Sequence, residues 1–360
     1  MTSGTGENTL NTVVLTKMET VKCYILAIDV QLAVKIGIIG YRNHAMRLLS
    51  LLEERNDCEI SSIYHPVKSI NDSRSTKNLD DLYKCDAVLI ASPNHTHFTY
   101  IEKLLKNSDG YIFCEKPPVT SLNDLETLEK LPTQKKHRIF FNFNFRFSKI
   151  SENLKNYINS NKIGQLIHVN IISAHGLAFK KNYIDSWRAD GKNNLHNILD
   201  TVSIHYLDLL NYHMGKFDES FYFPSLISRN GSSYDTSHVV MKYNNGTTVS
   251  ILNSYASPLI NELLILGTNG YFAVRNDQLA VYSPRDTFDA RGYFVTPPIL
   301  KKSTFSMKDD YEESLKKSLN YFMSNVNKKI PMSIDHFNAS LSTNRLGINL
   351  HKQNHVLDEG

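Results

Sequence analysis

Residues 35–49 read KIGIIGYRNHAMRLL: an apolar strand reaches a glycine and continues as an amphipathic helix. This order begins a dinucleotide-binding loop, whose G-x-G-x-x-G fingerprint gives each glycine a task. The first makes the tight turn, the second lets the backbone approach the pyrophosphate, and the third allows close helix–strand packing. Here the three positions hold Gly40, Arg42 and Ala45. Three interpretations are open: a working cofactor loop, a loop in which Arg42 itself pairs with phosphate, or the fold alone.

Length and composition narrow the class of protein. A chain of 360 residues predicts two domains, or one domain with a large insertion. The formal net charge is +4, and no dense Lys/Arg stripe with interleaved aromatic residues is present. The uncharged apolar runs are strand-sized, far short of the ~20 residues of a membrane span. We therefore expect neither a nucleic-acid partner nor a membrane partner.

The chain has four cysteines, Cys23, Cys58, Cys85 and Cys114. They are scattered and form no C-x-x-C pair, so we expect no zinc site. Cys85 and Cys114 fall in or beside expected buried strands, which is typical of free thiols in a reducing compartment. The cysteine pattern therefore predicts a cytoplasmic protein without a metal ion.

The first 33 residues differ from the rest of the chain. A polar run of small residues precedes a short apolar run, CYILAIDVQLAV, which Asp29 interrupts. No basic start leads into a long apolar core, so we do not expect a secretory signal. Two interpretations of this leader are open, a true start at Met18 or an additional edge strand.

Short apolar runs alternate with helical patterns over residues 34–148. Strands are expected at 34–40, 59–65, 86–92, 111–115 and 138–145, and helices at 45–54, 97–107 and 121–131, the last capped by Ser121. Near-continuously apolar strands separated by helices predict a parallel sheet that is covered on both faces. This segment is expected to form a Rossmann domain.

Alternation in the last of these strands predicts the direction of its side chains. Successive side chains of a strand point to opposite faces. One face is expected to hold core phenylalanines, Phe141, Phe143, Phe145 and Phe147. The other face is expected to turn Asn144 and Arg146 toward a substrate.

The pattern of apolar and polar residues changes after about residue 150. Helices are expected at 150–161 and 195–213, followed by longer alternating segments and a hairpin at Asn245-Gly246. Residues 149–303 are therefore expected to form a substrate and oligomerisation domain, and residues 304–360 a C-terminal helical segment. The predicted fold class is α/β: an N-terminal Rossmann domain plus a C-terminal α/β domain with a large, mostly antiparallel open sheet.

Two strand ends carry polar clusters, ASPNHTH at 91–97 and FCEKPP at 113–118. In open α/β sheets, ligands bind outside the carboxyl ends of the strands. Lys116 stands between Glu115 and Pro117, where it is fixed and partly desolvated. Such a lysine can bind a sugar hydroxyl or take its proton. The alternative is an ordinary surface Glu-Lys pair.

The end of the second strand bears on coenzyme choice. NAD-binding folds place an acid there, ~20 residues after the loop, to hold the ribose hydroxyls. This chain has His65, Lys68, Ser69 and Arg74 in that region and no acid at the strand end. A 2′-phosphate would suit the basic residues, so NADP is slightly favoured over NAD. The alternative is that they are surface loop residues.

The order of motifs then resembles the Gfo/Idh/MocA oxidoreductase family over about residues 34–350. The segments that carry the resemblance are AVKIGIIGYRNHA, DAVLIASPNHTHF, IFCEKPPV, NFNFRFS, SWRAD and ILDTVSIHYLDLL. The resemblance implies a Rossmann domain and an α/β domain whose open sheet often forms a dimer interface, here in a homodimer or homotetramer. It also implies hydride transfer between NAD or NADP and a sugar, inositol or nucleotide sugar.

The resemblance also implies roles for individual residues. Lys116 matches the lysine that contacts substrate near the nicotinamide, and Trp187 and Arg188 match a pair at the substrate site. Asp200 and His205 resemble the D-x-G-x-H-x-x-D signature, in which histidine is the general acid/base and aspartate supports it. The loop, the strand ends and the resemblance together give these expected cofactor contacts: Gly40, Arg42, Asn43, His44, Ala45, His65, Lys68, Ser92, Pro93, Asn94, His97, Glu115 and Lys116.

The match departs from the family at the signature itself. The family's aspartate precedes its histidine by four residues, where this chain has Thr201, and Asp200 precedes His205 by five. The additional residue rotates the aspartate by roughly a quarter turn on a regular helix. A helical bulge or a non-helical start would restore convergence. Ser203 also replaces a glycine, and His205 could instead be a satisfied core residue of an amphipathic helix.

We therefore predict an NAD(P)-dependent oxidoreductase that acts on a sugar, nucleotide sugar or polyol. One alternative is a non-catalytic protein that binds a dinucleotide or sugar and serves as a regulator, like the galactose regulators that resemble this family. The other is an NAD-dependent glycosidase of the same family.

Overall fold

A computed structural model describes residues 33–160 and 162–353 of the chain. Apart from Ala33, the expected leader at 1–33 lies outside the described residues, and so does Cys23. No helix among the described residues is long and apolar enough to cross a membrane.

The first sheet is parallel, as predicted, but it has six strands where the sequence predicted five. Its strands run in the order β3-β2-β1-β4-β5-β6. Their bounds are β1 Val34–Ile39, β2 Cys58–Tyr64, β3 Ser75–Thr76, β4 Ala87–Ile90, β5 Tyr111–Glu115 and β6 Ile139–Asn142. The chain reverses direction across the sheet between β1 and β4, which is where doubly wound folds bind nucleotides. The carboxyl ends of β1, β4 and β5 therefore meet at one edge.

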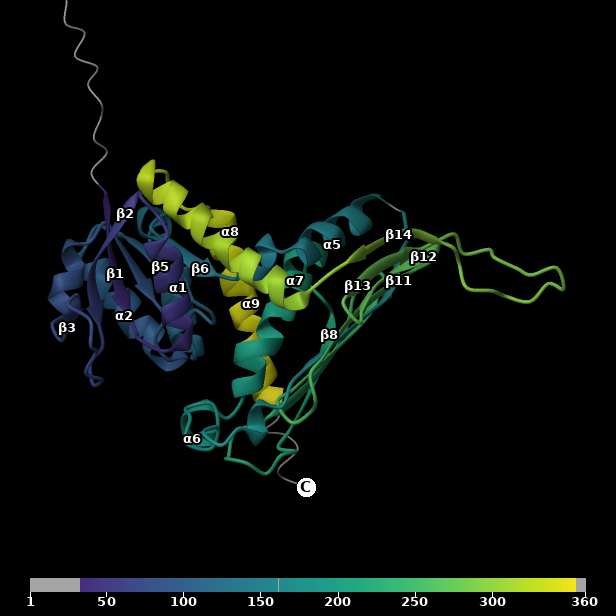
Figure 1. Cartoon of the computed structure of the whole chain (residues 1–360), viewed down its shortest axis with the longest axis horizontal. Coiled ribbons are helices and arrows are strands. Elements are labelled where there is room, and N and C mark those ends of the chain that lie inside the picture. Colours follow the sequence, from purple (N-terminus) through teal and green to yellow (C-terminus); the bar gives the residue numbers. More distant parts are fainter. Residues whose placement is uncertain (1–32, 161, 354–360) are drawn as a thin grey trace, which may run out of the picture. The chain divides into compact units, whose positions relative to one another are not determined.

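Helices cover both faces of this sheet (Figure 1). The helices that follow its strands are α1 Asn43–Glu53, α2 His97–Asn107, α3 Leu122–Glu129 and α4 Thr133–Lys136, and three 3₁₀ turns are η1 Leu79–Lys84, η2 Asn94–Thr96 and η3 Asn144–Phe147. Leu48 and Leu52 of α1 pack under one face, and Ile101 and Leu104 of α2 under the other. The Ser121 cap is confirmed, since its Oγ accepts from Asp124 N at 3.1 Å.

The expected strand at 138–145 is shorter in the structure. β6 ends at Asn142, and residues 144–147 form η3. Strict alternation therefore stops at the strand end, and the prediction that Asn144 lies on an open sheet face is wrong. Asn144 is 2% exposed, and its Nδ2 donates to Ser314 Oγ at 2.7 Å.

The second sheet is eight-stranded and mostly antiparallel, in the order β14-β13-β12-β11-β7-β10-β9-β8. Only β7 and β10 pair in parallel. The bounds are β7 Leu166–Ala174, β8 Glu219–Ser225, β9 Thr236–Lys242, β10 Thr248–Ser254, β11 Ile260–Gly267, β12 Gly270–Arg275, β13 Gln278–Tyr282 and β14 Ile299–Thr304. The predicted hairpin at Asn245-Gly246 joins β9 to β10 and is confirmed. The predicted α/β fold class is thus confirmed in both halves.

One face of this sheet carries a core under three helices, α5 Lys149–Ser160, α7 Ile204–Met214 and α9 Ile334–Gln353. Shorter elements precede α7: η4 Leu177–Phe179, α6 Gly191–Asn194 and a π-helical turn, η5 Leu199–Ser203. Alternate side chains such as Val239, Ile251 and Ile265 enter the core, which explains the period-two pattern of the sequence.

The two C-terminal helices return to the first sheet. Leu315 and Phe322 of α8 (Met307–Asn327) join the core on the α1 side, whereas Phe337 and Leu341 of α9 join the core on the α2 side. Each such buried side chain contributes roughly 1.5–3 kcal/mol. The tail is therefore part of the Rossmann core as well as of the second sheet's core.

Candidate active site

The turn after β1 has the backbone that a phosphate-binding loop requires. Gly40 has φ +112°, and a Cβ there would approach Ala91 O to 2.6 Å. Ala45, at the third fingerprint position, is 1% exposed and packs α1 closely on the sheet. The helix starts with no side-chain cap and no acid in its first turn, so its free N–H groups and positive dipole end suit a pyrophosphate. The loop residues therefore fit a dinucleotide.

Arg42 does not fill this loop. It is exposed and extended at the N-cap of α1, next to the exposed Asn43. Its charge acts on His65: burial, then the charges of Lys77, Arg42 and Lys68, lower the pKa of that imidazole. Arg42 thus belongs to a basic group at the end of β2, which would accept additional phosphate charge.

The basic side chains of the loop after β2 differ in whether they are already paired within the protein. Lys77 Nζ donates to the main-chain oxygen of His65 at 3.0 Å, so it lies in this group although no sequence motif marked it. Lys68 is exposed, with Nζ 5.6 Å from the Tyr41 ring centroid. Arg74 is occupied, because its Nη2 lies 2.7 Å from Asp72 Oδ2 and 2.8 Å from Glu53 Oε1.

The loop after β4 is held by His97. Its ring is fully buried, with Nδ1 2.8 Å from Pro117 O and Nε2 2.9 Å from Ser92 O. Both nitrogens therefore face main-chain oxygens, and His97 fixes two neighbouring loops instead of presenting an atom to a cofactor.

Two residues beside His97 remain suited to ligand contact. Pro93 leads into η2, and Asn94 is 6% exposed with a buried Nδ2 that has no hydrogen-bond partner among the described residues. Buried polar atoms are nearly always paired in native proteins, so an orphaned amide indicates a missing partner. A bound cofactor would supply one.

Glu115 ends β5 beside this loop, and Lys116 follows it directly. Glu115 Oε1 lies 2.7 Å from His44 Nε2 and accepts from Asn142 Nδ2 at 2.7 Å. Burial raises the pKa of Glu115, but the His44 charge and these two hydrogen bonds outweigh burial and leave the pKa below its ordinary value. His44 is therefore tied to the carboxylate at the end of β5.

Lys116 reaches from β5 to the other half of the molecule. Its Nζ donates to Thr201 O at 2.6 Å. Burial lowers the pKa of Lys116 to about 8; the charges of Glu115 and Asp200 oppose this effect and that of Arg188 adds to it. A lysine with a pKa of about 8 can both give and take a proton near neutral pH.

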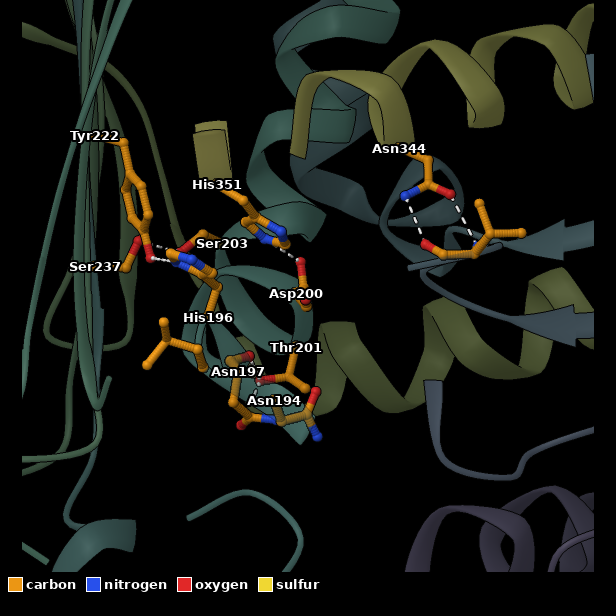
Figure 2. Close-up of polar contacts among 12 residues, drawn as sticks. Asn194, His196, Asn197, Asp200, Thr201, Ser203, Tyr222, Ser237, Asn344 and His351 are labelled. Atoms are coloured by element: carbon orange, nitrogen blue, oxygen red, sulfur yellow. Dashed lines mark hydrogen bonds and ion pairs between the residues drawn. The ribbon is translucent and has the colours of Figure 1, made fainter. Parts of the chain in front are cut away.

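The π-helical turn η5 contains the displaced aspartate, Asp200. It spans Leu199–Ser203 and therefore includes Asp200, so the additional residue is absorbed as a bulge. A bulge was one of the two alternatives expected from the spacing. Asp200 nevertheless does not hydrogen-bond to His205. Its Oδ1 accepts from His351 Nε2 at 3.0 Å (Figure 2).

His205 is buried and stacked on Phe145, with ring centroids 4.6 Å apart. Its Nδ1 is buried and has no hydrogen-bond partner in the described part of the chain. Burial, followed by the charges of Lys116 and His44, puts the pKa of His205 well below its ordinary value. The imidazole is therefore neutral at pH 7.

The residues expected to hold substrate divide into two groups. Arg188 lies with its guanidinium carbon 4.6 Å from the Trp187 ring centroid, and its charge acts on Lys116. Arg146 is inside the fold, where its Nε donates to Asp208 Oδ2 at 2.8 Å and the two side chains are 3% and 0% exposed. Arg146 and Asn144 thus make contacts inside the fold, whereas Arg188 lies over Trp187 and its charge acts on Lys116.

Sequence reasoning missed several polar groups around Thr201 and Tyr255. Thr201 Oγ1 and Tyr255 OH lie 2.6 Å apart, and the ring of His175 lies 5.1 Å from that of Tyr255. Asn197 Nδ2 and Tyr183 OH are buried and lack partners among residues 33–160 and 162–353. The positions carry no motif, since segments far apart in sequence bring them together. Over the same described ranges, no cluster of three or more His, Cys, Asp or Glu could hold a metal ion.

Comparison with known proteins agrees with this architecture. Residues 34–143 match the oxidoreductase family with an NAD-binding Rossmann fold, and residues 152–273 match the GFO/IDH/MocA C-terminal domain. Glucose-6-phosphate 3-dehydrogenase of Bacillus subtilis is 24% identical over 187 residues, 49% of this chain and 53% of that enzyme. Myo-inositol 2-dehydrogenase of Thermotoga maritima is 25% identical over 229 residues, 61% of this chain and 66% of that enzyme.

The matched segments thus span less than two thirds of either relative. Among solved structures, levoglucosan dehydrogenase in complex with NADH and levoglucosan superposes with a TM-score of 0.71 at 15% identity, covering 89% of this chain and 97% of that one. At that identity the likeness concerns the fold. The two family models, the strand order and the β1 turn agree: this chain belongs to the Gfo/Idh/MocA family of oxidoreductases, with an NAD(P)-binding Rossmann domain.

Proposed function

We propose that the protein is an NAD(P)-dependent dehydrogenase or reductase that interconverts a secondary hydroxyl and a carbonyl on a sugar, nucleotide sugar or polyol. The observation that carries the proposal is Lys116, which follows β5 at the nucleotide edge, contacts η5 and has a pKa of about 8. Relatives named for sugar and inositol dehydrogenation support the substrate class.

The cofactor would lie over the β1 turn. Gly40 allows close approach of the backbone, the N-terminus of α1 faces the pyrophosphate, and Asn94 offers its unpaired amide. The nicotinamide, when bound, supplies hydride acceptance or donation. NADP is the favoured coenzyme, because the charges of Lys77, Arg42 and Lys68 all act on His65 at the end of β2.

Two groups would act on the substrate oxygen. In carbonyl reduction the Lys116 ammonium donates its proton to the oxygen that becomes a hydroxyl, and in oxidation the neutral amine takes that proton back. Thr201 O holds the ammonium in place. His205, neutral at pH 7, would accept or share a hydrogen bond through its unpartnered Nδ1.

Groups that lack partners favour a hydroxyl-rich substrate. Asn197 Nδ2 and Tyr183 OH are buried and unpaired among the described residues, and Tyr255 borders them. A polyol hydroxyl both donates and accepts, so it could satisfy such groups. Positioning of the substrate by these contacts would supply a large share of the rate.

The alternative of a non-catalytic regulator draws less support from the site. Arg42 is exposed and leaves the loop open, and Ser203 Oγ donates to Ser237 Oγ at 3.0 Å in place of the family's glycine. Asp200 lies in η5, where its charge acts on Lys116. Glycoside hydrolysis would release a free sugar without net change of the coenzyme, so an assay of glycosides for sugar release would separate it from oxidation.

Assembly and location are proposed on separate grounds. A homodimer or homotetramer would bury the open face of the second sheet, where Ile172, Val240, Leu252 and Leu264 point away from the helix-covered core. A cytoplasmic setting would suit Cys58, Cys85 and Cys114, which are free thiols in the structure.

Titration of the purified full-length chain with NADPH and NADH, followed by nicotinamide fluorescence, tests the proposal. We expect binding of at least one coenzyme and turnover on a panel of sugars, polyols and their oxidised forms. Lys116→Ala should lower kcat about 10²–10⁴-fold while coenzyme binding persists. Lys192→Ala, an exposed lysine of α6, is the matched control. No binding of either coenzyme, or normal turnover by Lys116→Ala, would refute the proposal.

A further inference from the structure

A histidine outside the expected site holds the carboxylate of Asp200. His351 comes from α9, 151 residues further along the chain, and its Nε2 lies 3.0 Å from Asp200 Oδ1. Figure 2 shows the two side chains pointing toward one another from different helices. Their side chains are 21% and 12% exposed, so few water molecules can compete for this hydrogen bond. A largely buried carboxylate requires such a partner.

The His351 ring is itself held in orientation. The ring of His196 stacks on it, with centroids 4.2 Å apart and planes 10° apart. His196 Nδ1 in turn lies 3.3 Å from Tyr222 OH on β8 (Figure 2). Packing on one face limits rotation of the imidazole, so Nε2 remains directed at Asp200.

Asp200 connects this histidine to the proposed proton carrier. Four charged or titratable groups face Lys116: Glu115 from β5, Arg188 from the segment before α6, Asp200 from η5 and His205 from α7. The charges of Glu115 and Asp200 raise the pKa of Lys116, whereas burial and the charge of Arg188 lower it. The place of the Asp200 carboxylate therefore affects the protonation of Lys116.

We propose that His351 is a positioning residue of the active site, whose hydrogen bond holds the Asp200 carboxylate where its charge faces Lys116. This inference rests on the proposed function, because it concerns the lysine to which proton transfer is assigned. The π turn supplies the physical reason for a second anchor. A single irregular turn does not fix Asp200 as a regular helix would, and the bond to α9 fixes it from outside.

A purely structural role for His351 is less favourable, because other contacts dock α9. Phe337 and Leu341 are buried in the first core, and Leu350 is buried in the second. Gln353 Nε2 also ties the helix end to Ser220 O on β8 at 3.0 Å. These contacts secure the helix without contacting Asp200.

Three variants isolate the hydrogen bond. His351→Phe removes the donor but keeps an aromatic ring against His196. His351→Gln replaces the Nε2 donor with an amide N–H of similar reach. Gln353→Ala removes a docking hydrogen bond at the same helix end and is the matched control.

The first measurement is labelling of Lys116 in the full-length chain by an amine-acylating reagent across pH 6–10, followed by peptide mass spectrometry. It requires neither coenzyme nor turnover. We expect a midpoint near the pKa of about 8 in the parent chain. The midpoint should be lower in His351→Phe and in Asp200→Asn, because each removes or displaces the charge that raises it. It should be unchanged in His351→Gln and in Gln353→Ala.

The second measurement is steady-state kinetics. His351→Phe should lower kcat about tenfold with little change in KM, and His351→Gln should restore most of it. In the Asp200→Asn background, His351→Phe should add no additional loss, because it acts through the missing carboxylate.

The proposal would be overturned by an unchanged Lys116 midpoint in His351→Phe, or by a Gln353→Ala variant that reproduces the His351→Phe losses. An additional loss from His351→Phe without the Asp200 carboxylate would do the same. A chain inactive on every substrate would refute the proposed function, whereas the labelling experiment would still decide the role of His351.

Discussion

Lys116 Nζ donates to the main-chain oxygen of Thr201 at 2.6 Å, so the lysine that follows β5 is bound to the π-helical turn that contains Asp200. The two residues are 85 positions apart in sequence. Their contact joins the nucleotide-binding edge of the first sheet to the segment that precedes α7. The proposed chemistry depends on this junction.

The pKa of Lys116 predicts a pH profile. Lys116 carries its proton below about pH 8 and loses it above, because burial lowers its pKa to about 8. Carbonyl reduction needs the ammonium, so kcat for reduction should fall as the pH rises through about 8. Oxidation needs the neutral amine, so its kcat should rise over the same range. Steady-state rates in both directions between pH 6 and 10 test this, and parallel profiles in the two directions would contradict it.

Substitution of Gly40 should separate coenzyme binding from general strain. A Cβ at Gly40 would approach Ala91 O to 2.6 Å at φ +112°, so Gly40→Ala should abolish NADP(H) binding. Gly246→Ala is the control, since φ is +84° there and nothing lies within 4 Å of the added Cβ. The control should lose only about 1–2 kcal/mol of stability. Fluorescence titration and thermal unfolding measure both effects, and unaltered affinity in Gly40→Ala would show that the nucleotide binds elsewhere.

Coenzyme preference should respond to Lys68 but not to Arg74. Lys68 is exposed beside His65, whereas Arg74 is paired with Asp72 and Glu53. Lys68→Gln should therefore reduce the NADP:NAD ratio of kcat/KM by about tenfold, equivalent to ~1.4 kcal/mol. Arg74→Gln should leave the ratio unchanged. Equal ratios in the parent chain and Lys68→Gln would remove the assignment to a 2′-phosphate.

The buried pair of Arg146 and Asp208 should affect stability. Their side chains are 3% and 0% exposed, so Arg146→Met leaves an uncompensated charge and should cost about 3–5 kcal/mol. The pair of Arg275 and Glu262, whose side chains are 71% and 25% exposed, is the control, and Arg275→Met should cost about 0–1 kcal/mol. Urea unfolding measures both. A stable Arg146→Met variant with a raised KM for the substrate would instead support the substrate contact expected from the sequence.

The sequence predicted the elements whose signals are local. The helix expected at 97–107 and the strand expected at 111–115 match α2 and β5 in their bounds, and Ser121 caps α3 as its spacing with Asp124 indicated. Apolar period and capping act within a few residues, so they can be recognised without the tertiary structure. The pairing of β7 with β10, and the return of α8 and α9 to the first core, carry no such local signal.

The sequence predicted part of the candidate site, as it predicted part of the fold. Gly40, Asn94 and Lys116 follow strands that are recognisable in the sequence, so their common edge could be expected. His97 and Arg146 carry equally suggestive motifs, yet the fold turns both inward, onto main-chain oxygens and Asp208 respectively. Motif position does not determine side-chain direction once a strand ends.

By itself, the sequence determined the parallel sheet, the glycine turn and the lysine at its edge, because strand period, backbone freedom and chain order are local properties. Only the tertiary structure decided which groups complete that edge. The partner of Asp200 is His351 and the partner of Lys116 is Thr201 O, and both contacts join segments far apart in the chain. Their geometry arises when helices from the end of the chain pack against the two cores, a long-range burial of apolar surface that residue order alone does not specify.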